Sequence, residues 1–216
     1  MNISFRRSRG LSLECREKKG GDLRHITCVV AVALALAGCL PVTSTSPVGT
    51  TKSLGADNRL VGMWQGATDD GAPAWFAFVP GAHGGITAIV IGFPSATDSS
   101  GFYGTYSVRT ASLGKAAYVN AREVMENGQP VTGPLAEKFM LLLYRFRGPH
   151  TLVLYLADED ATKDAVKARK VDGTIEPGKF GDVTLTARPA DLDRFFASDA
   201  ALKLFTKPFV LLSRKS

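Results

Sequence analysis

The stretch MLLLYRFRGPHTLVLYL, from Met140 to Leu156, decides the predicted fold. One face of its first half is wholly apolar and consists of Met140, Leu142, Tyr144 and Phe146. The opposite face changes from leucine to arginine along its length. A Gly-Pro-His turn follows, and Leu152, Leu154 and Leu156 then restore an apolar face. The stretch therefore predicts an antiparallel hairpin with one solid apolar face, which suits a barrel or a strongly bent sheet.

The same pattern extends in both directions from this hairpin. Short apolar runs alternate with turns rich in Gly, Pro, Asn and Asp, and hairpin-sized connections favour an antiparallel meander over a βαβ fold. The predicted strands are Leu60–Gln65, Ala74–Val79, Ile86–Phe93, Phe102–Val108, Ala116–Met125, Phe139–Phe146 and Leu152–Ala157. The predicted fold class is mainly β (α+β), with a meander that closes into a barrel-like or strongly bent sheet.

The C-terminal third has a different pattern. Asp158–Lys170 carries alanines at helical spacing, and a short strand is expected at Val183–Thr186. Pro189 suits the first turn of a further helix, whose buried stripe is Leu192, Phe195 and Phe196. A last strand is predicted at Phe209–Leu212. We therefore expect helices beside the sheet in this third.

The net charge of +6 comes mainly from the first 38 residues. Seven of the 26 Lys and Arg and three of the 20 Asp and Glu lie there, so the rest of the chain carries a net charge of only +2. A domain so close to neutrality lacks the basic surface of a nucleic-acid-binding protein. Nucleic acid is therefore not an expected partner.

An uncharged run, Ile26–Ala37, follows Arg24. It is too short to span a bilayer, which takes about 20 apolar residues, but it suits the core of a secretory signal. The tetrad Leu36-Ala37-Gly38-Cys39 at its end resembles the bacterial lipoprotein signal motif. The alternatives are an N-terminal transmembrane helix and a buried core helix that ends in cysteine.

The lipoprotein resemblance implies cleavage before Cys39, a diacylglycerol on its thiol and a fatty acyl chain, such as palmitate, on its amino group. Two or three acyl chains anchor a protein durably in a membrane. Leu40, rather than Asp, follows the cysteine, and the enteric sorting rule then implies the outer membrane, on its periplasmic side. The segment before Arg24 is long for a signal, and a true start near Leu23 is an alternative.

The chain is thus expected to have three parts. Residues 1–38 are the signal peptide, 39–59 a lipidated flexible tether rich in Ser, Thr, Gly and Pro, and 60–216 a single β-rich domain. Cys15 and Cys28 lie in the leader and Cys39 is the lipid site. The domain therefore has no thiol for a disulfide, a nucleophile or a metal site.

Gly62-x-Trp64, within LVGMWQG, resembles the Gly-x-Trp signature of lipocalins and related small barrels. The resemblance implies that Trp64 closes one end of a barrel and that a basic residue on a late strand packs across its indole. Arg214 is the residue placed to do so. It also implies a cavity for a small ligand. The alternative is a Trp64 that is simply part of the core.

No pattern in the sequence predicts catalysis or a cofactor. His83 and His150 lie in Gly-containing turns without neighbouring ligands, so no metal site is expected. Asp69-Asp70 suits a hairpin turn and Asp158-Glu159-Asp160 a helix start. No nucleophile elbow, phosphate loop or dinucleotide motif is present. We therefore expect no enzyme and nominate no catalytic residue.

Three functions remain open for this expected membrane-anchored envelope lipoprotein. The first is a structural or interaction module that docks on another envelope protein. The second is a binder of a small apolar ligand inside a lipocalin-like barrel, and the third is an envelope hydrolase. A binder needs an unfilled interior, whereas an interaction module needs a filled interior and an exposed apolar patch. The residues whose placement discriminates are Phe76, Phe78, Phe93, Phe102 and Tyr103.

Overall fold

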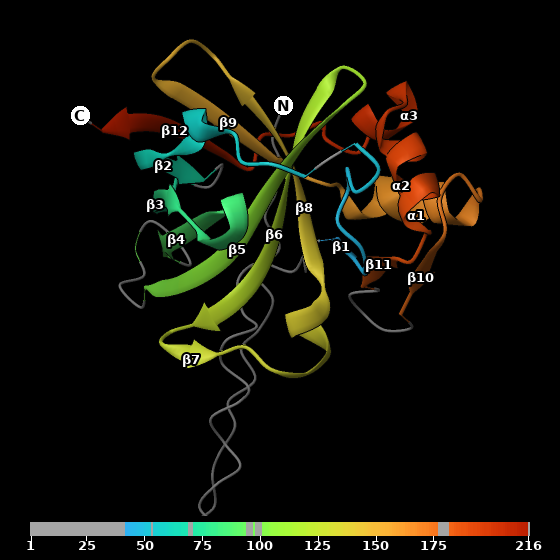
Figure 1. Ribbon diagram of the computed structural model, residues 1–216, viewed down its shortest axis with the longest axis horizontal. Helices are drawn as coiled ribbons and strands as arrows, with labels where there is room; N and C mark the ends of the chain where they lie inside the picture. Colours follow the sequence, from blue (N-terminus) through green and yellow to red (C-terminus); the bar gives the residue numbers. More distant parts are fainter. Residues whose placement is uncertain are drawn as a thin grey trace, which may run out of the picture. The chain divides into compact units, whose positions relative to one another are not determined.

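The structure, a computed structural model, describes residues 42–52, 54–68, 71–93, 97, 101–176 and 182–215. Its main feature is a closed antiparallel barrel of eight strands (Figure 1). In order around the barrel these are β2 (Gly62–Thr68), β3 (Pro73–Pro80), β4 (Ile86–Gly92), β5 (Phe102–Leu113), β6 (Ala116–Glu126), β8 (Phe139–Phe146), β9 (Thr151–Leu156) and β12 (Val210–Lys215), and β12 pairs with β2. The predicted mainly β class and the meander that closes into a barrel are confirmed.

Smaller elements flank the barrel. One group consists of β1 (Thr43–Ser44), β10 (Gly173–Ile175), β11 (Val183–Leu185) and the helices α1 (Glu159–Lys167), α2 (Pro189–Phe196) and α3 (Asp199–Leu202). The other elements are β7 (Gln129–Pro130), beside β6, and the 3-10 helices η1 (Asn58–Leu60), η2 (Ala82–Gly84) and η3 (Gly133–Glu137). The helices of the C-terminal third lie where the sequence predicts them; Asp158 caps α1 by accepting from the Ala161 N–H at 2.8 Å.

Two hydrophobic cores share the wall formed by β6, β8 and β9. The first fills the barrel and includes Trp64, Phe76, Phe78, Leu142 and Leu154. The second lies outside the wall, beneath the helices and β11, and includes Tyr118, Leu141, Leu143, Val153 and Phe196. Alternate side chains of β8 therefore enter different cores. This explains why the second face of the predicted strand begins as leucine and ends in arginine.

Residues 42–52, which we call the N-terminal strap, are not a flexible tether, so the expectation of a tether over 39–59 is wrong for this part. Val42 and Val48 are buried in the second core, and β1 pairs with β8 and β11. The fully buried side chain of Asn120 accepts from the Val48 N–H at 2.6 Å and donates to the Val48 carbonyl at 2.9 Å. Asp193 of α2 accepts from the N–H groups of Gly49 and Thr51.

Candidate functional site

Trp64 and Arg214, the two residues that the lipocalin resemblance pairs, contact each other at one end of the barrel, which we call the closed end. Trp64 is fully buried and its Nε1 donates to the Leu60 carbonyl at 2.7 Å. The Arg214 Cζ lies 4.2 Å from the centre of the indole ring. The guanidinium also donates to the carbonyl oxygens of Val61, at 2.7 Å, and Arg59. The last strand is thereby fastened to η1 and to the start of β2.

Gly62 has a steric reason to be glycine. Its φ is +133°, and a Cβ there would lie 2.8 Å from the Arg214 Nη1. A larger residue would be strained and would push the guanidinium away from the indole. Glycine, tryptophan and the distant arginine therefore belong to one arrangement, although 150 residues separate Trp64 from Arg214 in the chain.

A second cation–aromatic pair lies beside the first. The Arg59 Cζ is 4.7 Å from the centre of the Phe146 ring, and the Phe146 and Trp64 ring centres are 6.1 Å apart. Arg59 also forms an ion pair with Asp57, whose Oδ2 accepts from the Tyr144 hydroxyl at 2.9 Å. Burial alone would raise the pKa of Asp57, but the hydrogen bonds from Arg59 and Tyr144 hold it below its usual value.

Sequence reasoning missed Asp57 and Arg59, because both fell within the expected tether. Their sequence signal was an Asp two residues before an Arg, directly ahead of the Gly-x-Trp strand. Asp57 also caps η1 by accepting from the Arg59 N–H. These contacts hold Asp57 and η1, the segment directly before β2, over the closed end.

An open pocket of ≈ 410 Å³ lies on the outside of this closed end. Its lining is mainly apolar and is formed by Arg59, Phe146, Gly148, Pro149 and Arg214. No carboxylate lines it. The pocket therefore combines a largely apolar lining, which includes Phe146, with the side chains of two arginines.

The opposite end of the barrel contains a polar pair. The Tyr106 hydroxyl donates to Glu123, and both lie against Gly104, where a Cβ would be 2.8 Å from the hydroxyl and 3.0 Å from the carboxylate. Burial, together with the nearby Glu126, raises the pKa of Glu123, and the bond from Tyr106 only partly offsets this. The pair places one partly buried carboxyl group near the end of the barrel opposite Trp64.

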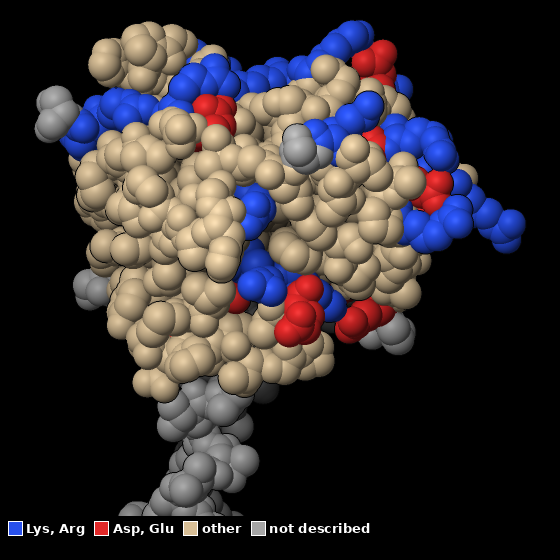
Figure 2. Space-filling model, viewed as in Figure 1, with Lys and Arg blue, Asp and Glu red and all other residues tan. Residues whose placement is uncertain are grey.

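The outer face of β2, β3, β4 and β5 carries an uncharged, partly exposed patch. In strand register, its side chains are Met63, Ala77, Ile89 and Thr105 in one row and Gln65, Trp75, Ile91 and Tyr103 in the next. We call these eight residues the bare face. Met63 is 50% exposed, Tyr103 46% and Ile91 43%. Figure 2 shows the left side of the molecule, over β3 and β4, without Lys, Arg, Asp or Glu below its upper edge.

The opposite wall of the barrel shows what such a face looks like when it is covered. Leu141 and Leu143, on the outer side of β8, are each 1% exposed, because the helices and the N-terminal strap pack on them. Ile89 and Ile91 have the same alternation and the same chemistry, but no described residue covers them. Exposed apolar areas of this kind mark interaction sites in soluble proteins.

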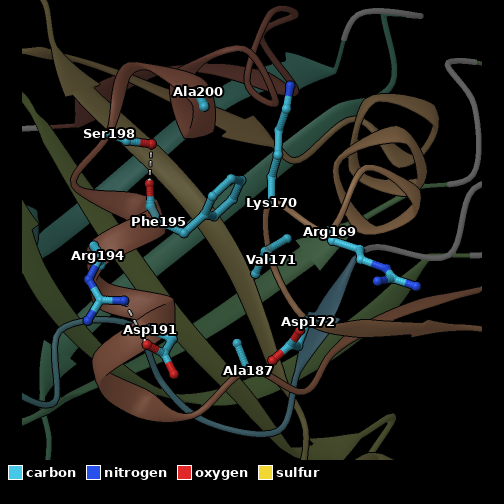
Figure 3. A pocket seen from close by; sticks show the side chains of 10 residues that line it. All are labelled: Arg169, Lys170, Val171, Asp172, Ala187, Asp191, Arg194, Phe195, Ser198 and Ala200. Atoms are coloured by element: carbon cyan, nitrogen blue, oxygen red, sulfur yellow. Dashed lines mark hydrogen bonds and ion pairs between the residues drawn. The ribbon is translucent and has the colours of Figure 1, made fainter.

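A further pocket of ≈ 430 Å³ lies among the helices (Figure 3). Val171 and Phe195 face its interior, and Ser198 donates to the Phe195 carbonyl at 2.6 Å. On its rim Arg194 is paired with Asp191 at 2.8 Å, and Arg169 extends away from the interior. Arg194 and Asp191 are therefore paired with each other on α2, and the charged groups of the rim do not converge on one point.

The remaining predicted residues have the following places. The lipid site Cys39 and the motif residues Leu36, Ala37 and Gly38 lie outside the described residues. Phe76 and Phe78 are stacked inside the barrel, with ring centres 6.0 Å apart, whereas Phe93 packs edge-on against Trp75.

Among the described residues there is no group of three or more His, Cys, Asp or Glu able to hold a metal ion. No helix in this part of the chain is long and apolar enough to cross a membrane. Comparison with protein-family models, with curated proteins and with solved structures finds no match to this chain.

Proposed function

We propose that the protein is a lipid-anchored interaction module of the bacterial envelope, whose bare face docks on an apolar surface of another envelope protein. The observation that carries this proposal is the uncharged, exposed face of β2–β5. Its outward-facing apolar side chains alternate as they do on the wall under the helices, but no described residue packs on Ile89 and Ile91. The proposed anchor is an acylated Cys39 in the outer membrane, with the domain in the periplasm. The support for the anchor is the signal motif in the sequence.

The position of the N-terminal strap favours a protein over a bilayer as the occupant of the bare face. Cys39 precedes the buried Val42 by three residues, so the two Cα atoms lie at most about 10 Å apart. β1 pairs with β8, and β3 lies four strands from β8 in either direction around the barrel. An eight-stranded barrel is roughly 15 Å across. An anchor on Cys39 therefore stays on the covered side, and the bare face is directed away from it.

The packing of the barrel interior supports the same choice over a ligand binder. Phe76, Phe78 and Trp64 are buried among leucine and valine side chains from the other strands. Neither of the two pockets described above is lined by these three side chains. A filled interior combined with an exposed apolar face is the arrangement expected of an interaction module.

Photo-crosslinking in cells tests the docking role. A photoreactive amino acid replaces Ile91 on the bare face or, as a control, Lys203 at the end of α3, which is exposed. We expect a discrete adduct from position 91, none from position 203, and loss of the adduct when Ile89→Lys is added. Ile89 is 39% exposed, so the lysine should change the free energy of unfolding by no more than about 0.5 kcal/mol. Equal adducts from both positions, or none, would contradict the proposal.

The anchor is tested separately by intact mass spectrometry of the membrane-extracted protein and of a Cys39→Ser variant. The expected native mass is that of residues 39–216 plus acyl chains, and the variant should lack those chains. An unacylated native chain that retains residues 1–38 would refute the anchor and leave the docking role to the crosslinking result.

A further inference from the structure

We propose that the pocket at the closed end of the barrel binds an amphipathic anion, with an apolar, preferably flat body and one carboxylate or phosphate group. Its residues are Arg59, Phe146, Gly148, Pro149 and Arg214, and its volume of ≈ 410 Å³ lies within the range of small-molecule sites. This inference is independent of the bare face and of the proposed docking role.

The charges of the pocket select an anion. Among the described residues, Arg214 donates to two backbone carbonyl oxygens and pairs with no carboxylate, so its positive charge is not neutralised. Arg59 uses its Nε and Nη2 on Asp57, and its side chain is 70% exposed. The side chains of Arg59 and Arg214 both line the pocket, and its lining residues include no acid. A cation would be repelled there, and an anion would gain charge-assisted hydrogen bonds.

The rings of the pocket select an apolar body. Phe146 forms part of the lining, and the turn at Gly148 and Pro149 supplies a further apolar wall. Arg59 already lies over the Phe146 ring, so its planar guanidinium is held in place before a ligand arrives. Such a plane also stacks on flat ligand groups, which a lysine would not do.

The surroundings of the pocket are basic. Arg147 and Lys215 are exposed on the elements that border it, and Asp57 is the acid paired with Arg59. Figure 2 shows Lys and Arg gathered at the upper left of the molecule, over η1 and the end of β12. Long-range attraction therefore favours the approach of anions to this end of the barrel. The anion has two conceivable sources, a free small molecule and the headgroup of an anionic lipid.

Titration of the purified full chain with 2-naphthoate, followed by ¹H–¹⁵N NMR, tests the proposal. We expect saturable shifts at the amides of Arg59, Phe146 and Gly148, and at least ten-fold weaker binding of the neutral analogue 2-naphthalenemethanol. Equal affinity for the neutral analogue, or shifts confined to the bare face, would overturn the proposal.

Two variants sharpen the test. Arg59→Gln should weaken 2-naphthoate binding about ten-fold, because it removes one of the two charges. Arg188→Gln is the matched control: Arg188 is also exposed and paired with a carboxylate, Asp191, but lies in the cap of α2, away from the pocket. Unchanged affinity of Arg59→Gln, or an equal loss in the control, would overturn the assignment.

Vesicles distinguish the two sources of the anion. If the ligand is a lipid headgroup, the chain binds vesicles containing phosphatidylglycerol better than pure phosphatidylcholine, Arg59→Gln reduces this binding, and 2-naphthoate competes with it. If the ligand is a free molecule, 2-naphthoate binds at the pocket without any Arg59-dependent vesicle binding. Either result supports the shared chemistry, whereas failure of both probes to bind at the pocket refutes it.

Discussion

Arg214→Met removes the charge and the donors that fasten the last strand to η1, while it keeps a side chain of similar length. The cation–π contact with Trp64, at 4.2 Å, contributes about 0.5–2 kcal/mol. The bond to the Val61 carbonyl, at 2.7 Å, involves a charged donor and adds about 1.5–3 kcal/mol. The Arg59 carbonyl belongs to an exposed residue, and water can replace its partner. We therefore expect a loss of about 2–4 kcal/mol in the free energy of unfolding.

Urea unfolding of the purified full chain, followed by tryptophan fluorescence, measures this loss because Trp64 is fully buried. A loss of 2–4 kcal/mol corresponds to a Tm lower by roughly 5–15 °C for a chain of this size. Arg214→Lys keeps the charge but not the planar guanidinium, so its free energy of unfolding should lie between those of the wild type and of Arg214→Met. Arg188→Met is the control, because the Arg188 side chain is 86% exposed and should cost less than about 0.5 kcal/mol. A loss below about 1 kcal/mol for Arg214→Met, or an equal loss in the control, would refute the reasoning.

Three further perturbations test other parts of the structure. Asn120→Ala should cost about 2–4 kcal/mol, because a buried N–H and C=O of the N-terminal strap both lose their partner, and hydrogen exchange should accelerate in the strap but not in β3 or β4. Glu123→Gln should remove one pH-dependent contribution: because the folded pKa of Glu123 is raised, its protonated form stabilises the fold below about pH 4.5 and this stability is lost as the pH rises, so the urea midpoint of the wild type, relative to that of the variant, should fall as the pH rises above 4.5. Gly66→Ala would place a Cβ 1.9 Å from the Leu211 carbonyl oxygen and should lower the Tm severely or prevent folding, whereas Gly55→Ala meets no atom within 4 Å and should leave the Tm nearly unchanged.

The barrel could be predicted from the sequence because its signals are local. In the hairpin from Met140 to Leu156, the alternation of side chains and the Gly-Pro turn fix strand type and direction within a few residues. The same signals recur in each predicted strand of the barrel. Closure of the sheet then follows from the number of strands and from the need to pair both edges.

The N-terminal strap could not be predicted because its partners are distant in the chain. Its composition of Ser, Thr, Gly and Pro is typical of a tether. The bonds that hold it come from Asn120 and Asp193, more than 70 residues away. No local pattern in the sequence of the strap predicts that the Asn120 amide and the Asp193 carboxylate bind its backbone groups.

The candidate site could be predicted only in part from the sequence, for a related reason. Trp64 and Arg214 follow from a resemblance, but Asp57 and Arg59 acquire their places through tertiary contacts with Tyr144 and Phe146. The bare face could not be predicted from the sequence either. Outward-facing apolar residues alternate on β4 and β8 alike, and only the tertiary structure distinguishes the wall that the helices cover from the wall that they leave exposed.

The place of β12 has a consequence for the order of folding. This strand is the last in chain order, yet it lies between β9 and β2, so every earlier strand is made before the ring can close. Until then the growing chain has an open sheet with two unpaired edges, and the indole of Trp64 lacks its guanidinium cover. Ring closure therefore waits for the synthesis of Val210–Lys215. Loss of this one short strand would leave both edges free to pair with other chains.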